Sequence, residues 1–257
     1  MKAAFFRRVV AVPAVVLAVQ LLVPPAGASH AWAGFHWART ANPLQLQLGR
    51  NLSGPWVSVL DTTSADWSAS AVVDTAVVAG GTNAKRCNPT AGRVEVCNAS
   101  YGRNGWLGVA SVWASGSHVT RATVKVNDSY FSMAKYNTPA WRNSVMCQEV
   151  GHTLGLGHND EDFSTVNGTC MDYADDPTQN QHPNAHDYEQ LATIYSHLDT
   201  TNTAVSSTGA ANRSAASLYA QDEWGRAIRY SSDGRPVVFE RPLPQGERLV
   251  TFVVWAR

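Results

Sequence analysis

Charge is scarce in this chain of 257 residues: only 16% of them are Asp, Glu, Lys or Arg, and only four are lysine. Basic and acidic residues number 20 each, so the chain has no net positive field that would attract nucleic acid or an acidic membrane. Apolar residues make up 44%, enough to fill a core, which argues against wholesale disorder. The length suits one large domain, or one domain with a small appendage.

Several catalytic signatures are also missing. The sequence has no G-x-S-x-G elbow and no phosphate-binding glycine loop, so neither a serine hydrolase nor a nucleotide enzyme is indicated. It has no C-x-x-C pair, which argues against a cysteine-ligated metal.

The N-terminus has the three-part pattern of a secretory signal peptide. Arg7 and Arg8 precede an apolar run over residues 9–23, and the small residues Ala26-Gly27-Ala28 follow it. This run holds fifteen residues, fewer than the roughly 20 that a membrane span needs. We therefore predict export, cleavage after Ala28, a secreted and extracellular location, and no membrane span in the mature chain.

Four cysteines would remain after cleavage, and an even number in an exported chain favours disulfides. They are Cys87, Cys97, Cys147 and Cys170. Three pairings are open; the one that closes the shortest loops joins Cys87 to Cys97 and Cys147 to Cys170.

Local patterns predict an α+β fold. Strand patterns with period two or with β-rich composition occur over 44–48, 71–78, 93–96, 106–113, 119–126, 236–239 and 249–255. Helical spacing occurs near 56–67, and a helix start is clear where Thr138 is a suitable N-cap and Pro139 follows it. That helix should end at Gly155, and a second should cover 185–198.

The expected organisation has five parts. They are a signal peptide over 1–28, a leader over 29–42, a main domain over 43–199, a linker over 200–217 rich in Thr, Ser, Ala and Asn, and a β-rich C-terminal tail over 218–257. The tail either forms a small appendage or completes the main core.

The chemistry-bearing stretch runs from Gln148 to His158. Gln148 and His152 are four positions apart and project from one helix face, so both side chains can hold one ion. Glu149 is offset by about 100° and can reach a water on that ion. Gly155 allows a sharp turn that swings His158 back toward the same point. Neutral imidazoles suit zinc, and three protein ligands with an open fourth position are typical of a catalytic site.

This stretch resembles the extended zinc signature H-E-x-x-H-x-x-G-x-x-H of the metzincin metallopeptidases, in particular secreted bacterial proteins of matrixin-like type. Glu149, His152, Gly155 and His158 stand in register with the signature. Met171 is similar to the methionine of the family's Met-turn, and the predicted helix from residue 185 resembles the one that follows that turn in matrixins.

The resemblance implies a twisted mixed sheet, an active-site helix and a second helix after the Met-turn. It also implies a zinc-dependent endopeptidase that cleaves a protein or peptide substrate with a zinc-activated water and Glu149 as general base. Its single catalytic Zn²⁺ would be held by Gln148, His152 and His158, above Met171. Tyr173 would either line the substrate pocket or belong to the core. A Cys147–Cys170 bridge would tie the helix to the Met-turn.

Position 148 departs from the signature, which has histidine there. Three interpretations stay open. Gln148 is a weaker ligand in a working enzyme, or His182 or His186 completes the site instead. In the third, the site is inactive and the chain is a secreted binding protein on the same fold.

Acidic residues surround this stretch: residues 143–212 contain ten acids and no Lys or Arg, so the local field favours a cation. Calcium at Asp160, Asp162 or Asp175 would suit this charge, although no motif supports it. Of the histidines outside the signature, we expect His30 and His36 to be exposed, His118 to lie in a turn and His197 to end a helix. The sequence leaves the oligomeric state open.

Overall fold

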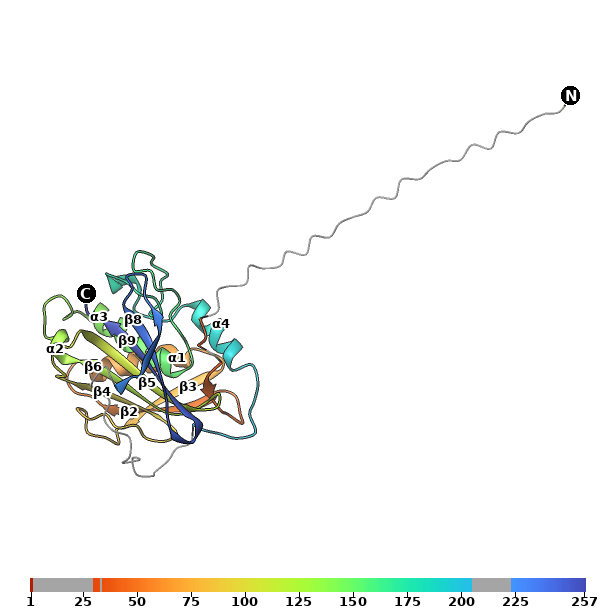
Figure 1. The fold of residues 1–257 in the computed structure, drawn as a ribbon, viewed down its shortest axis with the longest axis horizontal. Coiled ribbons are helices and arrows are strands. Elements are labelled where there is room, and N and C mark those ends of the chain that lie inside the picture. The colour runs from red at the N-terminus through yellow and green to blue at the C-terminus, as the bar shows by residue number, and fades with distance from the viewer. Residues whose placement is uncertain (2–29, 33, 205–222) are drawn as a thin grey trace.

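The computed structural model describes residue 1 and residues 30–32, 34–204 and 223–257 (Figure 1). Residues 2–28 of the predicted signal peptide and residues 205–217 of the predicted linker lie outside this described part. Among the described residues, no helix is both long and apolar enough to cross a membrane.

One large mixed sheet organises the described chain. Its nine strands among these residues are β1 (His36–Trp37), β2 (Leu44–Asn51), β3 (Val73–Ala79), β4 (Val94–Ala99), β5 (Trp106–Ser115), β6 (His118–Asn127), β7 (Arg226–Tyr230), β8 (Pro236–Pro242) and β9 (Glu247–Trp255). The order is β3-β2-β4-β6-β5-β9-β8-β7, with β1 beside β6. Pairing is parallel among β1, β2, β3, β4 and β6, and antiparallel from β6 through β5 to the C-terminal strands.

The strand sequences match their places in the sheet. In β2, Leu44, Leu46 and Leu48 are buried while Gln45 is exposed, as the alternating pattern predicts. β5 is buried over nine consecutive residues because it lies inside the sheet, between β6 and β9.

Four α-helices occur in the described part: α1 (Trp56–Ser68), α2 (Asp128–Phe131), α3 (Pro139–Thr153) and α4 (Ala185–Ile194). α3 begins at the predicted point, where the Thr138 hydroxyl accepts a hydrogen bond from the backbone N–H of Trp141. α1 packs against α3, and the indole N–H of Trp67 donates to the carbonyl of Cys147 over 3.2 Å. The mixed sheet and these helices agree with the α+β prediction.

α4 is shorter than predicted and ends at Ile194 rather than at residue 198. Beyond this point the backbone pairs with the leader instead of continuing the helix. Arg39 donates from its side chain to the Tyr195 carbonyl, and its own carbonyl accepts from the N–H of Asp199. These longer-range hydrogen bonds end the helix where local spacing alone would extend it.

The C-terminal tail joins the main sheet. β9 pairs with β5 along its whole length, from Trp106 opposite Trp255 to Ser115 opposite Glu247. Figure 1 shows the C-terminal strands in blue, and β9 is the one that lies next to β5. Of the two alternatives for the tail, the structure has the one in which it completes the main core.

Each disulfide joins two cysteines that follow one another in the order of cysteines along the chain. Cys87 is bonded to Cys97 and Cys147 to Cys170, each with a Cα–Cα distance of 5.9 Å. Disulfides suit an oxidising compartment. The second bridge ties α3 to the residue just before Met171.

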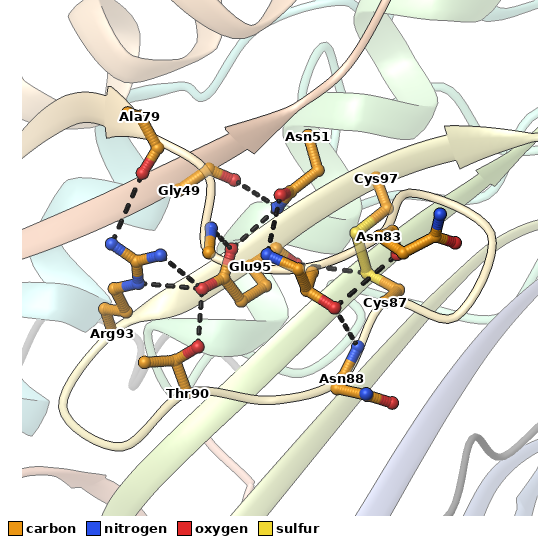
Figure 2. Close-up of polar contacts among 12 residues, drawn as sticks. Gly49, Asn51, Ala79, Asn83, Cys87, Asn88, Thr90, Arg93, Glu95 and Cys97 are labelled. Atoms are coloured by element: carbon orange, nitrogen blue, oxygen red, sulfur yellow. Dashed lines mark hydrogen bonds and ion pairs between the residues drawn. A yellow bond between two sulfur atoms is a disulfide. The ribbon is translucent and has the colours of Figure 1, made fainter. Parts of the chain in front are cut away.

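Near the first bridge lies a buried carboxylate with a full set of hydrogen bonds. Glu95 on β4 is 0% exposed. Its oxygens accept from Thr90 Oγ1 and Asn51 Nδ2, both at 2.6 Å, and from Arg93 Nε at 2.8 Å (Figure 2). This network joins β2, β4 and the loop between β3 and β4, and it satisfies a charge that would be costly if unpaired.

Replacing Glu95 by Gln is therefore expected to lower the free energy of unfolding by about 1.5–3 kcal/mol, the range for hydrogen bonds to charged groups. The amide keeps the shape but offers Arg93 no charge. Urea unfolding measures the change, and exposed Glu189→Gln is the control, expected to stay within about 0.5 kcal/mol. Equal stability of the two variants would show that the network contributes nothing.

Candidate metal and catalytic site

The signature residues gather at the C-terminal end of α3. Glu149 and His152 are fully buried, and Gln148 and His158 almost so. Gly155 has φ of 101°, and a Cβ there would lie 2.5 Å from the carbonyl oxygen of Phe35. This turn brings the His158 ring to 4.6 Å from the His152 ring, centroid to centroid, at an interplanar angle of 89°.

Both histidines have ring nitrogens without a partner among the described residues. His152 Nδ1 contacts the Leu156 carbonyl at 2.8 Å. A carbonyl only accepts, so Nδ1 carries the proton and neutral His152 keeps a lone pair on Nε2. Within the described residues, His152 Nε2 and both nitrogens of His158 form no hydrogen bond. Metal-ligating histidines are commonly oriented in this way, by a hydrogen bond from the other nitrogen.

Burial keeps both rings neutral. It lowers the pKa of His152 to about 3 and the pKa of His158 well below its usual value, and the nearby histidines act in the same direction. Neutral imidazole is the form that binds a metal ion.

These shifts predict acid sensitivity of the metal-free protein. The unfolded chain binds a proton at residue 152 below about pH 6.5 and the folded chain does not, so stability should fall as pH drops from about 6.5 to 3. The slope is about 1.4 kcal/mol per pH unit for one such histidine. In urea unfolding between pH 7 and pH 4, the free energy of unfolding of His152→Gln should depend less on pH, because the contribution of residue 152 is removed. Parallel curves for the two proteins would contradict the assignment.

Glu149 lies between α3 and β5. Gly108 makes this approach feasible, since a Cβ there would lie 2.5 Å from Glu149 Oε1. Neither carboxylate oxygen has a hydrogen bond of ordinary geometry within the described residues. Burial raises the pKa of Glu149 well above its usual value, and backbone groups of Ala110 and Val254 oppose only part of this effect. This conformation therefore favours the protonated form of Glu149.

Met171 forms the floor beneath α3. Gly151 lets the helix approach it, because a Cβ on Gly151 would lie 2.4 Å from the Met171 sulfur. The Met171 carbonyl accepts from the N–H of Asn159 at 2.7 Å, which holds the segment after His158 over the turn.

Gln148 contacts the segment that follows Met171, and Tyr173 belongs to that segment. The Gln148 amide donates to the Asp172 carbonyl at 3.4 Å, beside a cavity of about 20 Å³. Such a cavity holds about one water. Tyr173 is buried; its ring lies 4.4 Å from that of His158, and its hydroxyl donates to the Val253 carbonyl at 3.3 Å.

Three histidines outside the signature have neighbours of their own. His182 is half-exposed and contacts Asp66 on α1 at 2.7 Å. The His186 ring lies 4.9 Å from that of His30. The expectation that His30 is exposed was wrong: it is buried between Gly157 and Asp187, at 3.2 and 3.4 Å, because the leader folds back over the loop after α3.

The three aspartates considered for calcium have protein partners of their own. Asp160 and Asp162 accept hydrogen bonds from neighbouring backbone N–H groups, and Asp175 pairs with Arg257 at 3.1 Å. In the part of the chain that the structure describes, no group of three His, Cys, Asp or Glu ligands includes any of these three aspartates.

The C-terminal strand covers the site, which sequence patterns did not indicate. The ring of Phe252 on β9 stacks on His152 at 4.1 Å with an interplanar angle of 11°. Phe252 lies opposite Ala110 of β5, and Val254 lies opposite Gly108. β9 thus closes the space above Glu149 and His152.

Comparison with known proteins adds a distant likeness only. No family model matches the chain, and no curated protein matches it. Among solved structures the chain is similar to Myroilysin, with 13% sequence identity and a TM-score of 0.35, over 62% of this chain and 82% of that chain. At this level the likeness carries no argument about activity. The mixed sheet with helices and the two disulfide bonds are shown by the structure alone.

Proposed function

We propose that this chain is a secreted zinc-dependent endopeptidase of metzincin type, held in a closed form by its own C-terminal strand. The observation that carries the proposal is a buried group of polar atoms without partners within the described residues: His152 Nε2, both ring nitrogens of His158 and both carboxylate oxygens of Glu149. Burying unpaired polar groups costs free energy, and a fold without a ligand there would be more stable with apolar side chains. A metal ion would compensate for that cost.

The donor set suits zinc. His152 Nε2 and a nitrogen of His158 would be the two strong ligands, and the amide oxygen of Gln148 the third and weaker one. Zinc bound there would supply Lewis acidity.

Glu149 would act as general base and then general acid. It would take a proton from the attacking water, hold it on a carboxylate oxygen and pass it to the leaving amine. In the closed form burial raises the pKa of Glu149 and favours its protonated form. Displacement of β9 would admit solvent and lower its pKa, so opening and activation would coincide.

The substrate would be an extended peptide. With β9 displaced, β5 would present an unpaired row of backbone N–H and C=O groups, to which a peptide can add as a strand. A peptide in the position of β9 would pass directly over Glu149, since Val254 and Gly108 are opposite each other there.

A silent binding protein on the same scaffold is the second candidate, favoured by the stacking of Phe252 on His152. The two are separated by zinc analysis of the mature, disulfide-intact protein folded with zinc present. The peptidase requires one zinc equivalent that is lost on His152→Ala. A zinc content that this substitution leaves unchanged would favour the binding protein.

A further inference from the structure

Three histidines from distant parts of the chain converge on one carboxylate oxygen. Asp199 Oδ1 lies 3.2 Å from His118 Nε2, 3.5 Å from His36 Nε2 and 3.6 Å from His197 Nε2. His36 was expected to be exposed, but it is buried, because β1 pairs with β6 and places it in register with His118.

Backbone hydrogen bonds aim two of these ligands. Asp199 Oδ2 accepts from the N–H of Arg39 at 2.9 Å, and the N–H of Asp199 donates to the Arg39 carbonyl at 2.8 Å. His36 Nδ1 donates to the Gly34 carbonyl at 2.9 Å, which leaves a lone pair on Nε2 of the neutral ring. The lone pair therefore faces an oxygen that is also rich in electrons.

A divalent cation would satisfy all of these groups at once. Neutral His118 or His197 can donate an Nε2–H to Asp199, but the lone pair of His36 Nε2 would still face the carboxylate. Protonating all three rings would place three positive charges together, with the His36 ring 5.0 Å from that of His118 and 4.9 Å from that of His197. A single divalent ion would instead be attracted by the carboxylate and bound by neutral imidazoles.

The spacing of three of these groups fits one metal ion. Zinc–ligand bonds of about 2.0–2.1 Å place neighbouring ligand atoms about 3.3 Å apart, and the distances of 3.2 and 3.5 Å from Asp199 Oδ1 to His118 and His36 lie close to this value. The ligand atoms of His36, His118 and Asp199 all lie within 4.8 Å of one another, a group that does not include His197. Two imidazoles and one carboxylate suit zinc and the neighbouring divalent transition metals.

We propose that His36, His118 and Asp199 hold a divalent transition metal ion that stabilises the fold. Water, or the half-exposed His197 side chain after a small movement, would complete the coordination. The ion would clamp the leader and the segment after α4 to the start of β6. This proposal is independent of the proposed peptidase activity, since it shares no ligand with the group at His152.

Zinc titration of the tag-free, mature protein stripped with a chelator tests this metal site, which we call the clamp. Calorimetry should show one zinc equivalent at the clamp, and His118→Ala should abolish this binding or lower its affinity at least about 100-fold. At a free zinc concentration of about 100 times Kd, the natural chain should gain roughly 5–10 °C in Tm, and His118→Ala should lose this gain. His118 is partly exposed, so its truncation should leave the fold intact.

Three further variants identify the ion's location. Asp199→Asn keeps the acceptor for the Arg39 N–H but removes the charge, and should weaken binding similarly. His182→Ala removes a half-exposed histidine that also contacts a carboxylate, and should bind zinc as the natural chain does. His152→Ala should leave the zinc equivalent at the clamp and the associated gain in Tm unchanged.

If His118→Ala matches His182→Ala in the number of zinc ions bound, in affinity and in Tm, or if the natural chain gains no stability with zinc, the proposal is wrong. Loss of an equivalent in His152→Ala alone would overturn the clamp and support the peptidase site.

Discussion

Phe252→Ala is expected to cleave peptides about 100-fold faster than the natural chain. Truncating a buried Phe costs about 3–5 kcal/mol, and this ring is buried against His152 in the closed form. The substitution destabilises only the closed form, because Phe252 does not contact His152 in the open form. Each 1.4 kcal/mol multiplies the open population by ten, so even the lower cost gives roughly a 100-fold increase. Hydrolysis of an unfolded protein substrate with zinc present measures it.

Phe239→Ala on β8 is the matched control. Phe239 is also buried in the tail, but its ring packs on Trp224 at 5.2 Å. The two variants should lose similar stability, whereas only Phe252→Ala should gain activity. An equal gain in both would mean that general loosening of the tail, rather than the contact with His152, exposes the site.

Glu149→Ala is expected to reduce cleavage by at least about 10²–10⁴-fold, the usual loss on removing a general acid–base group. The effect is best measured in the Phe252→Ala background, where the open population is larger. Zinc content should stay unchanged because Glu149 is not a proposed ligand. Unchanged hydrolysis would exclude Glu149 as the base.

A second readout separates this loss from damage to the fold. Since burial raises the pKa of Glu149, the folded closed form holds a proton that the unfolded chain releases above about pH 4.3. The contribution of Glu149 to stability should therefore decrease as pH rises above that value, which opposes the contribution of His152 below about pH 6.5. Glu149→Gln should remove this dependence and be the more stable protein at pH 7. An inactive variant that unfolds more easily at pH 7 would contradict this account.

The local elements of the site could be predicted from sequence because their determinants are local. Thr138 caps α3, Gly155 turns the chain, and the spacing from Glu149 to His158 brings two imidazoles together. The disulfide between Cys147 and Cys170 also follows from short loop closure.

What covers the site depended on contacts that no local pattern encodes. The run from residue 249 to 255 is typical of a strand, but nothing in it specifies β5 as its partner. His36 and His118 are far apart in sequence, and only the pairing of β1 with β6 brings them together. The end of α4 likewise depends on hydrogen bonds between Arg39 and the segment after Ile194.

The third ligand at the candidate active site is still a proposal. Gln148 is on the correct face of α3, and its amide nitrogen donates to Asp172. The structure gives His182 another partner, Asp66, which weakens its case as a substitute ligand.

Anomalous X-ray diffraction at the zinc absorption edge, on crystals grown with zinc, tests the central claim most directly. We expect a peak between the rings of His152 and His158, within bonding distance of His152 Nε2. A fully occupied peak at Asp199 with none at His152 would support the clamp alone and contradict the proposed peptidase site.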